Sequence, residues 1–268
     1  MKTGGYGDSA QGFTIVETLI VLAVTSVLFF SAALLINGKQ NRTDFQIGSR
    51  AIQQQFQQVI NETQSGFYPG NGDFTCQAKP GGLTFSNASN TQGANGDCIF
   101  AGKTVTLNPA ASTNRKYNVY SLAGRRVDSA GKDVKTPVDA SLKSIPNAAQ
   151  TAQIPNGLEY YGNRPEGSAA TPWAHTDPYA MAFVSSMANF ASTQDGTQRL
   201  ELHGYKQWVS TDTDEDNINM EINVAGAYPL LPGVDLCFNS GGTDQSVIVT
   251  ISQGLRVSSA IKTGKNCP

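Results

Sequence analysis

The chain has 268 residues with 19 Lys plus Arg against 21 Asp plus Glu, a formal net charge of −2, which gives no overall attraction for nucleic acid. Charged residues make up 15% of the chain, while Gly, Asn, Ser and Thr are abundant. This composition suits an exported β-rich domain with long ordered loops. It is also compatible with partial disorder between roughly Gly124 and Pro155.

An almost unbroken apolar segment runs from Phe13 to Ile36, with Glu17 near its start. At about 1.5 Å per residue it gives roughly 36 Å of helix, enough to cross the hydrocarbon core of a bilayer. A secretory signal peptide would have its cleavage site after the apolar run, where Asn37-Gly38-Lys39 stands. An ionised side chain is costly in a bilayer, so Glu17 is expected to serve a specific task. The plain alternative is an uncleaved single-pass anchor.

Gly12-Phe13-Thr14-Ile15-Val16-Glu17 resembles the N-terminal motif of the type IV pilin superfamily, which includes the type II secretion pseudopilins. In that family a prepilin peptidase cleaves after the Gly, the new N-terminal Phe is methylated, and the fifth mature residue is Glu. The resemblance covers Gly12 to roughly Ile60. It implies a leader peptide over 1–12, processing and methylation at Gly12 and Phe13, and an assembly role for Glu17.

The resemblance also implies partners and a location. The partners are other pilin subunits in a helical fibre, the prepilin peptidase and the assembly machinery of the cytoplasmic membrane. The chain would be a single-pass protein of that membrane before assembly and part of an extracellular pilus fibre afterwards. Leu34 stands where many major pilins have a helix-bending Pro, which favours a minor pilin over the bulk subunit.

The helical pattern continues beyond the predicted transmembrane helix of 13–36. Apolar residues recur along one stripe whose neighbours are mostly Gln, at Phe45, Ile52, Phe56, Val59 and Ile60. We predict one helix from Phe13 to about Thr63, ended by Gly66 and Tyr68-Pro69-Gly70. Residues 37–65 form its amphipathic half, which needs a sheet to cover the stripe, and 66–268 form an extracellular β-rich head domain.

Ten β-rich segments separated by turn residues are predicted to supply that sheet. They are Leu83–Ser86, Thr104–Leu107, Tyr117–Leu122, Leu158–Tyr161, Met181–Ser185, Leu200–Tyr205, Met220–Val224, Val234–Phe238, Val247–Ile251 and Leu255–Ile261. Few helical patterns intervene, so the sheet should be antiparallel. The predicted fold class is α+β, with a long N-terminal transmembrane and amphipathic helix packed on an antiparallel β-sheet head, as in pilins.

The chain has four cysteines, Cys76, Cys98, Cys237 and Cys267, and none belongs to a CxxC pair. In an exported chain this favours two disulfides over a zinc site. Three pairings are possible and the sequence does not choose among them. We expect the local pairing, Cys76 with Cys98 and Cys237 with Cys267, in which each bridge contributes about 3–4 kcal/mol in the chain-entropy model. The second bridge would then resemble the C-terminal disulfide loop of many pilins.

The segment from Val234 to Val257 resembles the C-terminal hairpin of FimT/GspH-type minor pilins and pseudopilins, although Leu255 follows Gly254 and Ser258 replaces a second basic residue. Some such proteins serve DNA uptake. The alternatives to a structural minor pilin are therefore a DNA-binding competence pilin, a type II secretion pseudopilin and a tip adhesin with a cell-surface ligand. The cations that could contact phosphates are Arg256, Lys262 and Lys265 near the end, and Arg125, Arg126, Lys132 and Lys135 in one loop.

No enzyme is expected. The two histidines, His175 and His203, form no HExxH motif, and there is no GxSxG elbow. The segment Gly102-Lys103-Thr104 lacks the earlier glycine that a phosphate-binding loop needs at the correct spacing.

The best cation candidate is a run of alternating carboxylates, Asp212, Asp214 and Asp216. Calcium prefers such hard oxygen ligands. An EF-hand would have Gly at the sixth position of the loop, where Asn217 stands. A calcium site is therefore weighed against an ordinary acidic surface turn, and no other cofactor is expected.

A further aromatic set lies in a stretch rich in Pro and Gly, at Tyr160, Tyr161, Trp173 and Tyr179. It predicts either an adhesive surface or the packing of a subdomain.

Overall fold

The computed structural model describes residues 14–66, 74–79, 82–87, 98–108, 110, 114–128, 130–169, 171–176, 178–186, 199–205, 214–222 and 229–268. The predicted leader, with Gly12, and Phe13 lie outside these residues. The chain divides into two compact units, Met1–Asp44 and Phe45–Pro268. The division falls inside the predicted amphipathic half of the helix, because Phe45 is 2% exposed and packs in the core of the second unit.

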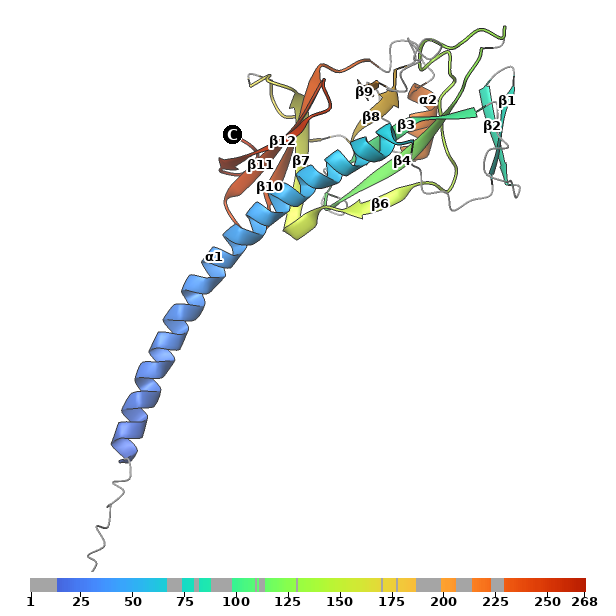
Figure 1. The fold of residues 1–268 in the computed structure, drawn as a ribbon. Coiled ribbons are helices and arrows are strands. Elements are labelled where there is room, and N and C mark those ends of the chain that lie inside the picture. The colour runs from blue at the N-terminus through green and yellow to red at the C-terminus, as the bar shows by residue number, and fades with distance from the viewer. Residues whose placement is uncertain are drawn as a thin grey trace, which may run out of the picture. The chain divides into compact units, whose positions relative to one another are not determined.

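Helix α1 spans Ile15–Gln64, which confirms the predicted long helix (Figure 1). Its stretch Ile15–Ala32 is long and apolar enough to cross a membrane and is not buried in the structure. A signal sequence near the N-terminus would share these features. The hydroxyls of Thr25, Ser26 and Ser31 donate to backbone carbonyls one turn back, at 2.7–2.8 Å, so these polar groups are satisfied inside the helix.

The second unit contains two antiparallel sheets and a separate hairpin (Figure 1). The four-stranded sheet has the order β12 (Val257–Thr263), β11 (Gln245–Ser252), β10 (Gly233–Ser240) and β7 (Leu158–Pro165). The six-stranded sheet has the order β5 (Lys143–Ser144), β4 (Lys116–Arg125), β3 (Cys98–Leu107), β8 (Tyr179–Ser185) and β9 (Leu200–Gly204), and β6 (Gln150–Gln153) pairs with β4. Strands β1 (Phe74–Lys79) and β2 (Gly82–Asn87) form the hairpin, and Pro155–Gly157 is a 3-10 turn.

The predicted apolar stripe of α1 is buried against both sheets, as expected. Phe45, Ile52, Phe56 and Ile60 are at most 2% exposed, and they share one core with residues of β3, β4, β8 and β9 and of β7, β10, β11 and β12. Phe56 contacts both sheets. The centroid of its ring lies 5.6 Å from the ring centroid of Tyr117 in β4 and 6.4 Å from that of Phe238 in β10. Residues 45–64 of α1 are therefore the central element of this unit.

Helix α2 (Asp214–Glu221) covers the opposite face of the six-stranded sheet, where Ile218 and Ile222 are fully buried. The predicted strand Met220–Val224 is therefore wrong at its described start, since residues 220 and 221 are helical. Three acidic residues in the first turn favour a helix, and the four-residue spacing of the two isoleucines places them on one face. Ser144 fastens this helix to β5 by donating its backbone N–H to Asn219 Oδ1 at 2.9 Å.

The other predicted strands are present, with boundaries shifted by a few residues, and three short or peripheral strands, β1, β5 and β6, were missed. The described residues of the segment 124–155, whose composition is compatible with partial disorder, are packed in the structure. It carries a bridge between Val127 and Asp133, and it buries Val134, Ala140, Leu142, Ile145 and Ala148.

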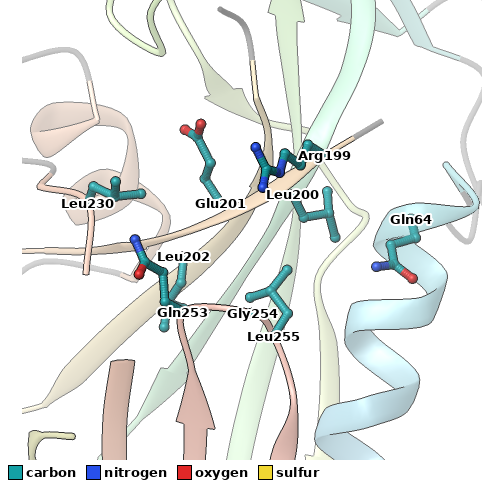
Figure 2. A pocket seen from close by; sticks show the side chains of 9 residues that line it. All are labelled: Gln64, Arg199, Leu200, Glu201, Leu202, Leu230, Gln253, Gly254 and Leu255. Atoms are coloured by element: carbon teal, nitrogen blue, oxygen red, sulfur yellow. The ribbon is translucent and has the colours of Figure 1, made fainter. Parts of the chain in front are cut away.

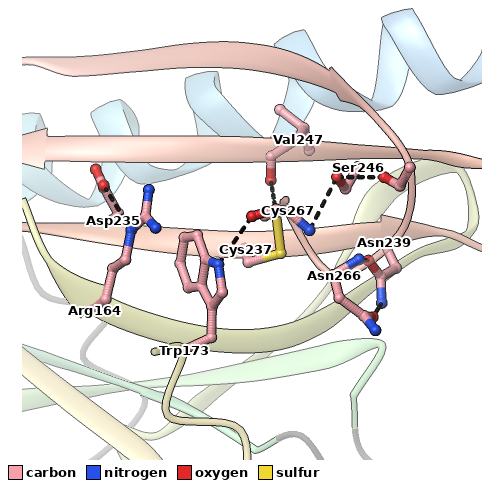
Figure 3. The surroundings of a disulfide bond; sticks show 10 residues. Arg164, Trp173, Asp235, Cys237, Asn239, Ser246, Val247, Asn266 and Cys267 are labelled. Atoms are coloured by element: carbon pink, nitrogen blue, oxygen red, sulfur yellow. Dashed lines mark hydrogen bonds and ion pairs between the residues drawn. A yellow bond between two sulfur atoms is a disulfide. The ribbon is translucent and has the colours of Figure 1, made fainter. Parts of the chain in front are cut away.

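The two disulfides join Cys76 to Cys98 and Cys237 to Cys267, which confirms the local pairing and leaves no thiolate for zinc. The first ties the β1–β2 hairpin to β3. The second ties the chain's last residues to the outer face of the four-stranded sheet (Figure 3). There Ser246 Oγ donates to the carbonyl of Gly264 at 2.7 Å, and the N–H of Cys267 donates to Ser246 Oγ at 3.2 Å.

Candidate functional site

Thr14 and Glu17 form a reciprocal hydrogen-bonded cap at the start of α1. The Glu17 carboxylate accepts from the Thr14 N–H and from Thr14 Oγ1, both at 3.0 Å, and the Glu17 N–H donates to Thr14 Oγ1 at 3.3 Å. This is a capping box, in which each side chain satisfies a backbone donor that the helix leaves unpaired. The sequence carries its signal, Thr-x-x-Glu before an apolar run, although no capping box was predicted there.

The capping box fixes where the Glu17 carboxylate lies. It is held in the first helical turn, at the end of the helix dipole that favours negative charge. The surrounding side chains are apolar and exposed, with Ile15 80%, Val16 64% and Ile20 58% exposed. A single anionic group thus sits at the head of an apolar helical surface. Such a surface is compatible with a membrane-spanning segment, and a signal sequence would share it.

A second glutamate of α1, Glu62, pairs with a buried lysine. Lys103 in β3 is fully buried, and its Nζ donates to Glu62 Oε2 at 2.5 Å, while Gln58 Nε2 donates to the other carboxylate oxygen at 2.8 Å. Partial burial alone would raise the pKa of Glu62, but the hydrogen bonds from Lys103 and Gln58 and the Lys103 charge hold that pKa below its ordinary value. The pair fixes the last turn of the helix against the sheet.

The same strand explains Gly102-Lys103-Thr104, the segment that the sequence analysis compared with a phosphate loop. These residues lie inside β3 and not in a loop. A Cβ on Gly102 would lie 2.1 Å from the carbonyl oxygen of Phe183 in β8, so the close approach of the two strands requires glycine there.

The predicted calcium ligands are only partly described. Asp212 lies outside the described residues. Asp214 Oδ2 accepts hydrogen bonds from Thr106 Oγ1 at 2.6 Å, Asn118 Nδ2 at 3.1 Å and Tyr120 Oη at 3.3 Å, so it anchors α2 to the sheet. Asp216 is exposed. Within the described residues no group of three His, Cys, Asp or Glu could hold a metal ion. Calcium binding stays a prediction that depends on Asp212.

The predicted DNA-binding cations, Arg256, Lys262 and Lys265, are all exposed. Arg256 and Lys262 have the same parity along β12 and its approach, so they project from the same face of the sheet. The other set lies around the 127–133 bridge, where Arg126, Lys132 and Lys135 are exposed. DNA binding by either set remains a prediction.

The aromatic set packs within the unit. Tyr160 is 1% exposed, and Tyr179 packs against the main core. Trp173 Nε1 donates to the carbonyl of Cys267 at 3.0 Å, and the guanidinium of Arg164 lies 4.2 Å from the centre of the Trp173 ring (Figure 3). These contacts favour the packing interpretation over an adhesive surface.

A cavity of about 610 Å³ lies among the last turn of α1, β9 and the turn before β12 (Figure 2). Its lining residues are Gln64, Arg199, Leu200, Glu201, Leu202, Leu230, Gln253, Gly254 and Leu255. Among these, no nucleophile stands beside a base. Neither histidine of the chain lines the cavity. His203 Nε2 lies 3.3 Å from Glu201 Oε2, and the ring of His175 packs edge-on against that of Tyr161. We assign no chemistry to this cavity.

Comparison of the chain with protein-family models, with curated proteins and with solved structures found no match. The class of the protein is therefore described by its architecture alone. The chain has an N-terminal apolar helix that could cross a membrane, followed by an antiparallel β-rich unit of α+β class with two disulfides.

Proposed function

We propose that the chain is a structural, non-enzymatic subunit, a minor pilin, of a type IV pilus or related pilus-like fibre. It is processed by prepilin peptidase after Gly12 and assembles through its N-terminal helix. The observation that carries the proposal is the hexapeptide Gly12-Phe13-Thr14-Ile15-Val16-Glu17 directly in front of a long apolar helix. The packing of residues 45–64 on a disulfide-bonded antiparallel β unit supports it.

The charge at the helix start gives assembly its geometry. After cleavage, the freed amine of Phe13 is a cation one residue before Thr14. The Glu17 carboxylate, already held in the first turn by Thr14, neutralises such an amine on an adjoining subunit. A subunit displaced along the fibre would leave both charges unpaired among apolar side chains, so the pair selects one axial register.

Apolar contact supplies the cohesion. The exposed large hydrophobic side chains between Ile15 and Phe30 have exposed fractions from 53% for Val24 to 80% for Ile15. In the membrane this surface faces lipid, and in the fibre it packs on neighbouring helices. Thr25, Ser26 and Ser31 do not oppose the transfer, because their hydroxyls bond within their own helix.

The experiment is incorporation into fibres sheared from cells. Glu17→Val is expected to give a stable membrane protein that is absent from the sheared fraction, and so is a Gly12 replacement that blocks cleavage. The matched control is Thr18→Val, which also removes a polar group from the first turns but whose hydroxyl donates only to the carbonyls of Thr14 and Ile15. Normal incorporation of the Glu17→Val protein would refute the proposal.

A further inference from the structure

In the described part of the chain, strand β12 forms one edge of the four-stranded sheet and pairs only with β11 (Figure 1). It is seven residues long, and Ala260, Ile261, Lys262 and Thr263 are all exposed. An edge strand presents a row of backbone N–H and C=O groups to any extended chain that approaches. This edge is a property of the Phe45–Pro268 unit and does not depend on the role of the apolar stretch Ile15–Ala32.

The ladder shows which backbone groups face outward. Ser252 N–H donates to the carbonyl of Arg256, and Gly264 N–H donates to the carbonyl of Asp244, so the pairs 252–256 and 244–264 are hydrogen-bonded. In an antiparallel ladder such pairs alternate, so Ser258, Ala260 and Lys262 bond to β11. The N–H and C=O groups of Val257, Ser259, Ile261 and Thr263 therefore point away from the sheet.

One contact confirms this direction and limits the open edge. Gln53 Nε2 on α1 donates to the carbonyl of Val257 at 3.0 Å, and Ser259 Oγ donates to Gln53 Oε1 at 2.8 Å. The helix thus covers the start of the edge. Among the described residues, the stretch from Ser259 to Thr263 has no strand beside it.

The charge of this region selects the kind of partner. Residues 245–268 contain Arg256, Lys262 and Lys265 but no Asp or Glu, in a chain whose net charge is −2. All three cations are exposed. A second copy of β12 would bring Lys262 close to its own copy, so like charge opposes self-pairing. A DNA backbone offers phosphate acceptors but no donors for the carbonyls of Ser259 and Ile261.

We propose that β12 binds an extended acidic peptide segment of a partner protein by strand addition. The outward N–H and C=O groups of Ser259, Ile261 and Thr263 form the ladder with the added strand. Carboxylates at alternate positions of that strand lie on the face that carries Lys262, within reach of Arg256 or Lys265 at its ends. Apolar residues at the other positions lie beside Ile261, which is 42% exposed.

Binding is measured with the full chain in detergent micelles and a fluorescent peptide of alternating Glu and Val, by anisotropy. Ile261→Pro removes an outward N–H without removing a bond to β11, and it is expected to weaken binding at least about tenfold. The control Ile261→Val keeps the N–H and is expected to bind like the parent. Lys262→Gln should weaken binding and flatten its salt dependence, and a Lys-Val peptide should not bind.

Thr263→Pro, which removes another outward N–H at the far end of the strand, repeats the test where any disturbance of folding is smaller. An equal loss of peptide affinity in both proline variants supports strand addition, provided that both variants unfold at the same temperature as the parent protein. Equal binding by Ile261→Pro and Ile261→Val overturns it. Displacement of the peptide by single-stranded DNA that binds both proline variants fully also overturns it, since that result indicates a charged surface without a ladder.

Discussion

Glu17 and Glu62 lie near the two ends of helix α1 and have different partners. The described hydrogen bonds of Glu17 are to Thr14 in its own first turn, and apolar exposed side chains surround it. Glu62 is bound by Gln58 and by Lys103, which is fully buried in β3. A carboxylate bonded across 41 residues of chain serves the fold, whereas one bonded only within its own turn is available for another molecule. We expect the first to be needed for stability and the second for assembly.

The largest expected effect on stability comes from Glu62→Gln. It removes the charge of the carboxylate that pairs with the fully buried Lys103, while Glu62 itself is partly exposed, and breaking a pair at a buried charge in this way costs about 3 kcal/mol. The measurement is urea unfolding of the full chain in micelles followed by tryptophan fluorescence. Glu17→Gln is the comparison, and we expect it to change the free energy of unfolding by at most about 0.5 kcal/mol.

The double variant Glu62→Gln with Lys103→Met sharpens this result. Removing both charges should restore much of the lost stability, because no unpaired charge then remains buried. Equal unfolding free energies for the Glu17 and Glu62 variants would contradict the assignment of separate roles.

Removal of the second disulfide is expected to have a somewhat smaller effect. Replacing Cys237 and Cys267 by Ala should lower the unfolding free energy of the Phe45–Pro268 unit by about 2–4 kcal/mol. Under the proposed function, insertion of the stretch Ile15–Ala32 into a membrane should be unchanged, since no cysteine lies in that stretch. Loss of membrane fractionation in this variant would show that the two units do not stabilise independently.

The pH dependence of stability tests whether the Glu62 carboxylate stabilises the fold as a charged group. Its pKa is held below the ordinary value in the folded protein, so its contribution is present above the unfolded pKa and is lost as the pH falls through the folded pKa. The stability difference between the parent and Glu62→Gln should therefore shrink as the pH is lowered through the carboxylate range. A difference that stays constant down to pH 2 would contradict a charged pair.

The most local effect is expected at Thr14, because it is confined to the first turn of α1. Thr14→Ala removes the capping box and should destabilise the first turn by about 1 kcal/mol, which corresponds to roughly fivefold faster exchange of the nearby amide hydrogens. Thr14→Ser keeps the hydroxyl and is the control. Unchanged exchange in Thr14→Ala, measured by mass spectrometry on the N-terminal peptide, would show that the cap does not position Glu17.

The spacing of apolar residues predicted the features that depend on a single face of a single helix. The stripe from Phe45 to Ile60 placed the amphipathic helix correctly, and the four cysteines paired locally as expected. The helix α2 was misjudged because Met220 to Val224 alternates like a strand, while Ile218 and Ile222 bury it as a helix. Tertiary burial outweighed local pattern there.

The polar contacts were the part that sequence could not supply. Nothing in the pattern links Glu62 to Lys103, because a fully buried lysine has no local signal and the pair joins a helix to a distant strand. The three bonds to Asp214 likewise depend on the register of β3 and β4. Only the Thr14–Glu17 capping box had a readable signature, and it lies inside the motif that carries the proposed function.

The most direct measurement is intact-mass and peptide mass spectrometry of the mature protein isolated from the cell envelope and from sheared fibres. We predict a polypeptide that begins at Phe13 with a methylated amine and lacks residues 1–12. A protein that begins at Met1 in every fraction, with no trimmed form, would contradict it.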